Sequence, residues 1–295
     1  MKTQVFNKMP FSLIYHKHMV PIATEITSMV LSYVKEKTGG RPLEMALDVG
    51  CGTGRSTLPL APHFKKVLGI DISDSQINVA KQYNTANNVS YMVAPAERLP
   101  VQDNSVDLVN TGLAAQLFTI ENFFNESVRV LKTNGCLAAH GFFPFPEIEY
   151  KDLSHDLNTA MSEMWDTLCQ QAYTTGLSEA ADHMLNQYRT IYETIDLKDK
   201  KWIKDIPVKY QMSISEIFGF ARSLCTCQIL LEKNEKEAKQ LLAQTDKSVP
   251  FGLLTLLPAT LHRPGKRMRD ILGEEADSAR LNFYIKHYCV LACKH

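Results

Sequence analysis

The sequence predicts an α/β fold built on a mainly parallel sheet. In the first half of the chain, short apolar runs alternate with segments of helical spacing, a pattern typical of successive βαβ units. The first apolar run ends in the glycine-rich turn GCGTG at residues 50–54, as expected where a buried strand passes into a helix. Residues 151–195 contain few glycines and have helical spacing, which adds a helical insertion or cap to the sheet.

The sheet core is predicted from apolar runs and the helix that precedes them. A leading helix over 21–35 is expected because Ile22, Ile26, Met29 and Val30 recur at helical spacing. Buried strands are expected at residues 44–49, 66–70, 89–93, 106–110 and 136–142.

Three helices are expected between these strands. The first follows the glycine-rich turn and is bent at Pro62, which has no N–H to donate. The second runs to about Tyr83 and opens with Ser73 and Gln76 at the spacing of a capping box. The third spans residues 121–131 and stops near Asn134-Gly135.

The second half of the chain is predicted to be mostly helical. Its helical region carries an apolar face that we interpret as the core of the insertion, formed by Leu157, Met161, Met164, Trp165 and Leu168. A strand over 206–212, a helix over 213–232 and a last strand over 281–292 follow. The chain is therefore divided into an N-terminal helix with the sheet core (1–145), a mostly helical insertion or substrate cap with one core strand (146–265), and a final strand that completes the sheet (266–295).

Composition excludes several classes of protein. The 295 residues are 45% hydrophobic and 22% charged, as in ordinary soluble proteins. Lys+Arg 32 equals Asp+Glu 32, whereas nucleic-acid-binding proteins normally carry a basic excess, so no nucleic-acid partner is expected. No apolar run approaches the roughly 20 residues of a membrane span, and none resembles a secretory signal. The seven scattered cysteines are typical of reduced thiols, which favours a cytoplasmic location.

The glycine-rich turn carries the strongest chemical signal. Its spacing is G-x-G-x-G, whereas a dinucleotide-binding turn has G-x-G-x-x-G. Asp48, two residues before the first glycine, would repel a pyrophosphate and suits a cationic amine instead. Asp71, at the end of the next strand, can accept hydrogen bonds from two vicinal ribose hydroxyls. Together these carboxylates fit a nucleoside that carries an amino acid.

Four motifs in order then resemble the class I S-adenosylmethionine-dependent methyltransferases. They are LDVGCGTG, Asp71 within VLGIDIS, the loop APAERLP at 94–100 and the strand VDLVN, and the resemblance covers about residues 43–143. The family implies a Rossmann-like, mainly parallel seven-stranded sheet with an antiparallel final hairpin. It also implies methyltransferase activity with S-adenosylmethionine as the cofactor.

The resemblance also implies a set of cofactor-binding residues. Asp48 and the glycines would line the methionine part, Ala96 and Glu97 would flank the adenine, and Asn110 and Thr111 would lie under the sulfonium. Cys51 is interpreted as a small filler of the turn. The complete set is Tyr15, Asp48, Gly50, Cys51, Gly52, Gly54, Asp71, Ile72, Ala96, Glu97, Asn110 and Thr111.

A closer similarity is to the trans-aconitate methyltransferase-like branch, whose members modify small molecules, often carboxylic acids. This chain departs from that branch at two places. It has Gln116-Leu117-Phe118 where the branch usually has His-Trp-Phe, and Arg222-Ser223-Leu224-Cys225 where the branch usually has Arg-Thr-Trp-Ser. Both changes remove tryptophans near the expected pocket. The resemblance implies a small-molecule substrate, with a carboxylic acid as one candidate, and the two changes argue against carboxylic acid specificity.

Three residues are candidates for direct action on the substrate. Arg222 could hold an anion or form a surface salt bridge, and His140 could be a base or a core histidine. Gln116 replaces the branch's histidine. No metal is expected, because His16-Lys17-His18 and Cys225-Thr226-Cys227 lack a second ligand pair at zinc-site spacing.

Two alternative functions remain open at this point. The altered pocket residues would also fit a cofactor-binding regulatory protein that has lost catalysis. A methyltransferase acting on protein or RNA is the third hypothesis, against which the neutral charge balance argues. The sequence does not give the acceptor atom or the oligomeric state.

Overall fold

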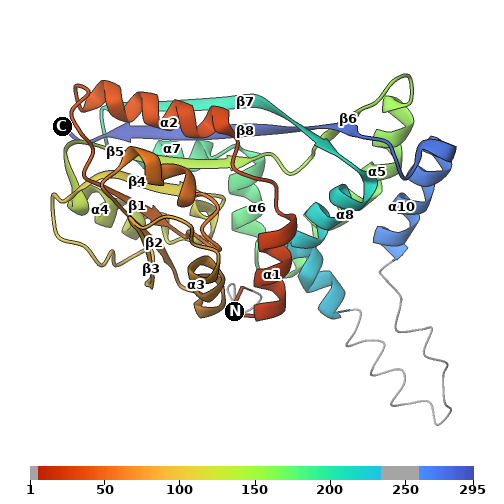
Figure 1. Cartoon of the computed structure of the whole chain (residues 1–295), viewed down its shortest axis with the longest axis horizontal. Helices are drawn as coiled ribbons and strands as arrows, with labels where there is room; N and C mark the ends of the chain where they lie inside the picture. Colours follow the sequence, from red (N-terminus) through yellow and green to blue (C-terminus); the bar gives the residue numbers. More distant parts are fainter. Residues whose placement is uncertain (1–5, 234–258) are drawn as a thin grey trace, which may run out of the picture.

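The computed structural model describes residues 6–233 and 259–295, and it confirms a mixed sheet covered by helices on both faces (Figure 1). The strands are β1 (Met45–Val49), β2 (Lys66–Asp71), β3 (Val89–Val93), β4 (Val106–Gly112), β5 (Leu131–Phe142), β6 (Glu147–Glu149), β7 (Asp199–Met212) and β8 (Leu281–Cys293). The α-helices are α1 (Met9–His18), α2 (Thr24–Lys37), α3 (Asp74–Gln82), α4 (Ile120–Val130), α5 (Ser154–Thr174), α6 (Ser178–Leu185), α7 (Arg189–Thr194), α8 (Ile214–Ser223) and α10 (Ala259–Leu272). Short 3-10 helices η1 (Leu58–His63), η2 (Ala115–Leu117) and η4 (Gly273–Glu275) complete these elements.

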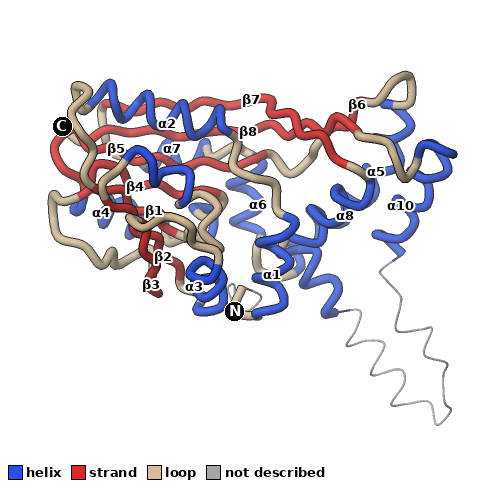
Figure 2. Tube along the Cα trace, in the orientation of Figure 1, coloured by secondary structure: helices blue, strands red, loops and turns tan. Residues whose placement is uncertain are grey.

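The sheet has eight strands. Six of them follow the order β3-β2-β1-β4-β5-β8, and the first five of these run parallel. β8 runs antiparallel to β5. β7 pairs with β8 along its opposite edge, and the short β6 continues the β5 edge beside residues 282–284 of β8. The long antiparallel pair of β7 and β8 extends from the parallel sheet to the helices of the second half (Figure 2). One strand more is present than the seven expected, because β6 was not predicted.

Alternating side chains of the central strands supply the core on both faces of the sheet, as the pleat requires. Ala46 and Leu108 pack with residues of α2 and α3 on one face. Leu47 and Val109 pack with residues of α4 and α7 on the other face. A separate cluster joins the predicted apolar face of α5, including Met161, to α8 and to the near half of β8.

One predicted strand start and one predicted helix type are wrong. The third helix, α4, agrees with the predicted 121–131 within one residue, but β5 begins at Leu131 and not at Cys136, so Asn134-Gly135 lies inside the strand. The cause is pairing with the sheet: the Asn134 N–H donates to the Lys294 carbonyl at 2.6 Å, and the Lys294 N–H donates to the Gly135 carbonyl at 3.0 Å. The helix expected after the glycine-rich turn is the 3-10 segment η1, which contains Pro62.

The helix expected over 213–232 is broken. α8 ends at Ser223, Leu224 is extended, and a second helical segment over Cys225–Lys233 leaves at 82°. Within the described residues, no single helix is long and apolar enough to cross a membrane, although this bent pair passes the same test of length and composition. A helix that was not expected, α1, contains Tyr15. The predicted division at residues 145 and 265 stays a prediction.

Candidate functional site

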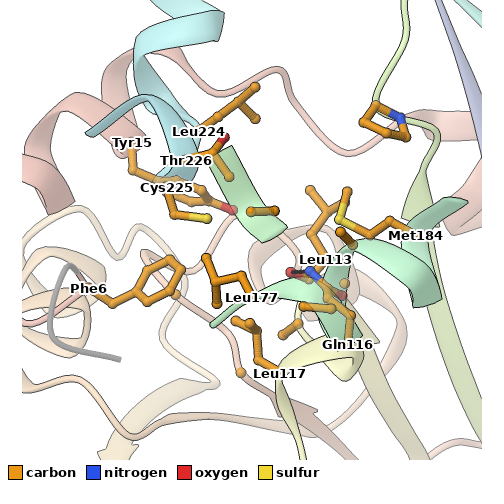
Figure 3. Close-up of a pocket in the computed structure, with 18 of the residues that line it drawn as sticks. Phe6, Tyr15, Leu113, Gln116, Leu117, Leu177, Met184, Leu224, Cys225 and Thr226 are labelled. Carbon is orange, nitrogen blue, oxygen red and sulfur yellow. Dashed lines mark hydrogen bonds between the residues drawn. The ribbon is translucent and has the colours of Figure 1, made fainter. Parts of the chain in front are cut away.

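A cavity of about 260 Å³ lies between the carboxyl ends of β1, β2 and β4 and the helices α1, α5 and α6. Figure 3 shows its wall, with Phe6, Tyr15 and Cys225 toward one side and Leu113, Gln116 and Met184 toward the other. Ligands of open α/β sheets bind at this edge, outside the carboxyl ends of the strands. The sequence-predicted residues on the wall are Tyr15, Gly50, Gly52, Asp71, Ile72, Ala96, Glu97 and Gln116.

The glycine-rich turn brings bare backbone to this wall. Gly50 has a φ of 67°, and Gly52 has a φ of 54°, in the left-handed region that side chains disfavour. A Cβ on Gly50 would lie 2.5 Å from the Cβ of Ala114, which is too close for two carbon atoms. The glycine-rich turn and the segment after β4 are therefore packed too tightly for a side chain at position 50. The turn therefore requires glycine at position 50 for both conformation and space.

Asp71 stands half-buried at the end of β2 and faces the cavity. Its Oδ2 accepts a hydrogen bond from the Gly52 N–H, and its Oδ1 accepts one from the Ser73 N–H, both at 2.9 Å. Burial raises the pKa of Asp71, and these backbone donors oppose the rise. Each carboxylate oxygen keeps a lone pair for a further donor.

Asp48 lies behind the wall, which corrects the expectation that it lines the cavity. It is fully buried, and its Oδ2 accepts hydrogen bonds from the hydroxyls of Ser56 at 2.7 Å and Thr57 at 2.6 Å. Its Oδ1 accepts a hydrogen bond from the Asn110 side-chain amide at 2.7 Å. Burial raises the pKa of Asp48 to about 6, although all three donors lower it. Asp48 thus joins the glycine-rich turn to β4.

Gln76 is a wall residue whose role the sequence did not reveal. Its backbone N–H bonds the Ser73 hydroxyl at 3.2 Å, which confirms the first half of the predicted capping box. The second half is wrong, because the buried Gln76 Oε1 has no hydrogen-bond partner. A Cβ on Gly52 would be 3.6 Å from this oxygen. An unpartnered buried acceptor beside an open turn calls for a ligand donor.

The loop after β3 and the helix α1 close the end of the cavity that lies beside the glycine-rich turn. Ala96 is buried, and the half-buried Glu97 accepts a hydrogen bond from the Thr119 N–H at 2.9 Å, which ties the loop to the start of α4. Burial raises the pKa of Tyr15 to about 12, so its hydroxyl stays neutral. The Ser73 hydroxyl donates to the Phe6 carbonyl at 2.6 Å and holds the segment before α1 over the cavity.

Six further predicted residues are not on the wall. Cys51 is buried in the turn, as its interpretation as a filler requires. Arg222 is exposed on α8 and lies off the wall, and its two alternatives stay predictions. The set consists of Cys51, Gly54, Asn110, Thr111, His140 and Arg222.

His140 is a core histidine in this structure. It is 3% exposed, and burial, together with the nearby His287, lowers its pKa to about 3. A ring with that pKa is a weak proton acceptor near neutral pH. Burial and the lowered pKa favour the core alternative for His140, which does not line the cavity.

Gln116 is held in place by two partners. Its Nε2 donates to the Leu113 carbonyl at 2.8 Å, and its Oε1 accepts the hydroxyl proton of Tyr188. Tyr188 is completely buried and adopts a left-handed φ of 64°, which is rare for an aromatic residue. No local pattern in the sequence points to Tyr188, which is 72 residues away along the chain.

One cluster of possible metal ligands occurs among the described residues, away from this wall. Asp199, Cys293 and His295 place their ligand atoms within 4.8 Å of one another. Asp199 already forms an ion pair with Lys37 at 2.7 Å and accepts the Tyr33 hydroxyl at 3.0 Å. None of these residues lines the cavity.

Comparison with known proteins agrees with the geometry of the site. Residues 47–139 match a family model described as a methyltransferase domain. A Dictyostelium discoideum protein assigned as a methyltransferase is 26% identical over 226 residues, which cover 75% of this chain and 77% of the relative. A Saccharomyces cerevisiae protein assigned as an S-adenosylmethionine-dependent methyltransferase is 29% identical over 143 residues, 47% of each chain. The chain is an S-adenosylmethionine-dependent methyltransferase.

The fold of this methyltransferase is also that of solved relatives. A structure of an Anaeromyxobacter dehalogenans protein, described as a type II methyltransferase, aligns with a TM-score of 0.61 at 18% identity, covering 90% of this chain and 97% of the other. The methyltransferase therefore has the Rossmann-like class I fold, with five parallel strands followed by the antiparallel pair β7 and β8.

Proposed function

We propose that this methyltransferase acts on a small molecule that enters the cavity between the strand ends and the α5–α6 helices. The observation that carries the proposal is the continuity of one wall, which runs from the glycine-rich turn to side chains of α5 and α6. Helices also cover the glycine end, where α1 places Tyr15 over the turn. A covered cavity of about 260 Å³ fits part of a small ligand better than a folded macromolecule.

The glycine end fits S-adenosylmethionine. Asp71 offers lone pairs to the ribose hydroxyls, and the unpartnered Gln76 Oε1 offers an acceptor beside Gly52. Ala96 and Glu97 would flank the adenine, and Tyr15 would cover the methionine part. Asp48 would act from behind the wall, by fixing the turn and by its charge.

When bound, S-adenosylmethionine supplies a methyl carbon that a lone pair of the acceptor attacks as the carbon–sulfur bond breaks toward sulfur. The residues of this chain hold the two reactants in line and exclude water from them, an effect worth roughly 7–11 kcal/mol in ideal cases. Methylation of a protonated acceptor also releases one proton to the bulk solvent.

A carboxylic acid is the less favoured acceptor within this proposal. The trans-aconitate-like resemblance suggested it, and Arg222 was the candidate to hold the anion. Arg222 is exposed, and the described wall contains no lysine, arginine or histidine. An anion in the apolar half would lose its hydration without a charged partner.

Binding and turnover test the proposal separately. Isothermal titration with S-adenosylhomocysteine should show one site per chain, and absence of binding at high micromolar ligand would count against the cofactor site. Turnover is then measured with a labelled methyl donor against small acids, phenols, amines and thiols. Label transferred to a member of this panel supports the proposal. Transfer only to protein or RNA fractions, or no transfer to any acceptor, contradicts it.

A further inference from the structure

The end of the cavity away from the glycine-rich turn is almost entirely apolar. It is formed by side chains that include Leu113, Phe142, Trp165, Leu168, Leu177 and Met184. In the part of the chain that the structure describes, the only charged side chains on the wall are Asp71 and Glu97, which lie at the strand ends and loop of the other half. This half of the cavity therefore selects its ligand by apolar contact and by hydrogen bonds to its few polar atoms.

Gln116 is the side-chain amide of this half, and its orientation is fixed by its partners. The Leu113 carbonyl can only accept a hydrogen bond, so the Gln116 atom 2.8 Å from it must be Nε2. Oε1 then accepts from the Tyr188 hydroxyl. An amide has two N–H donors and two lone pairs, so one donor and one acceptor remain for a ligand.

The support beneath Gln116 is rigid. Tyr188 is fully buried, and its ring packs edge-on against Tyr288 with centroids 4.7 Å apart. Its left-handed backbone is a strained conformation that the surrounding packing must maintain. The buried Tyr188 hydroxyl therefore holds the Gln116 amide in one orientation at the cavity wall.

We propose that Gln116 recognises an uncharged hydroxyl group on a largely apolar substrate. A hydroxyl is both donor and acceptor, so it can use the free Gln116 lone pair and the free Gln116 N–H together. A carboxylate can use only the N–H and would face Oε1 with a repelling oxygen. The inference rests on the proposed function, since it places the methyl acceptor's body in the apolar half of the same cavity.

Three ligands of matched shape test the proposal by isothermal titration: 4-butylphenol, its methyl ether 4-butylanisole, and 4-butylbenzoate. Each is titrated with and without saturating S-adenosylhomocysteine. We expect the phenol to bind about tenfold more tightly than either of the others, because only the phenol satisfies both free groups of Gln116. Benzoate affinity equal to that of the phenol, or no phenol binding at millimolar concentration, would overturn the proposal.

Variants assign the discrimination to the amide. Gln116→Leu should lower phenol affinity about tenfold, to that of the ether, and leave ether affinity within about twofold. Tyr188→Phe removes only the hydroxyl that orients Gln116 and should give a smaller loss in the same direction. Gln82→Leu, at an exposed position of α3, is the matched control and should retain the roughly tenfold ratio of phenol to ether affinity. A phenol-to-ether ratio unchanged in Gln116→Leu contradicts the proposal.

S-adenosylhomocysteine affinity and melting temperature, measured on every variant, report whether the fold is intact. If S-adenosylhomocysteine binds but the phenol is not preferred, the inference fails and the cofactor site stands. If S-adenosylhomocysteine does not bind, the cofactor part of the proposed function fails, and the ligand series without it still decides the role of Gln116.

Discussion

The two ends of the cavity are built by different means. At the glycine end, contiguous stretches of sequence carry the chemistry: residues 48–54 and 71–76 supply the turn, the Asp71 carboxylate and the Gln76 oxygen. At the apolar end, the wall is assembled from β4, α5, α6 and the break after α8, and its amide is oriented by Tyr188 from a separate segment. The first end is local in sequence, and the second is created by the fold.

This difference teaches which end constrains the substrate. The glycine end offers charged and polar atoms for a ligand of defined chemistry, whereas the apolar end offers shape and one oriented amide. Changes at the glycine end should therefore alter binding of the methyl donor for every acceptor. Changes at the apolar end should alter only the choice of acceptor.

The largest effect is expected at Gly50. Gly50→Ala should lower the free energy of unfolding by about 2–5 kcal/mol, from the left-handed backbone cost of about 1–2 kcal/mol and overpacking against Ala114 of about 1–3 kcal/mol. Gly176→Ala is the matched control, because Gly176 also has a positive φ of 76° but nothing within 4 Å of its Cβ position. Urea denaturation measures both, and equal losses would show that the close approach to Ala114 costs nothing.

The next effect is expected at Asp71. Asp71→Ala should weaken S-adenosylhomocysteine binding by about 1.5–3 kcal/mol for each charge-assisted hydrogen bond lost to the ribose. Asp74→Ala, exposed at the start of α3, should leave affinity unchanged. Isothermal titration gives both values. Similar S-adenosylhomocysteine affinities for the two variants would show that Asp71 does not bind the ribose. The glycine end of the cavity would then lack the charged contact that distinguishes it from the apolar end.

The same contrast explains what could be predicted from the sequence. β1 to β4 were predicted within a residue or two, because buried strands and glycine turns have local signatures, whereas β5 begins five residues earlier than predicted. Gln116 was named only as a substitution, since its partner Tyr188 is distant in sequence and its backbone conformation has no local signal. The position of Asp48 behind the wall was also missed, because three neighbouring donors compete for its oxygens.

A pH effect tests whether His140 belongs to the core. Its folded pKa is about 3, below the ordinary value of 6.5, so its contribution to stability is complete above pH 6.5 and is lost progressively toward pH 3. His287, with a pKa of about 4, acts in the same direction. Asp48, raised to about 6, acts oppositely, because the folded state then gains stability as pH falls from 6 to 4.

His140→Gln isolates one of these groups. Between pH 6 and 4.5, the free energy of unfolding of the variant should fall less steeply than that of the wild type, by about 1.4 kcal/mol per pH unit. Urea denaturation at three pH values measures the slope. Identical slopes would mean that the pKa of His140 is the same in the folded and unfolded protein, and would leave it available as a base.

The smallest effect is expected at Arg222, where the two ends of the cavity would both be unaffected. Its side chain is exposed and off the wall, so Arg222→Ala should change the affinities for S-adenosylhomocysteine and for 4-butylbenzoate by less than about twofold. Isothermal titration at low salt gives the strictest test, because any long-range attraction of an anion is least screened there. A selective loss of benzoate affinity would show that the apolar half recruits a cation from α8. That result would replace recognition of a neutral group with recognition of an anion.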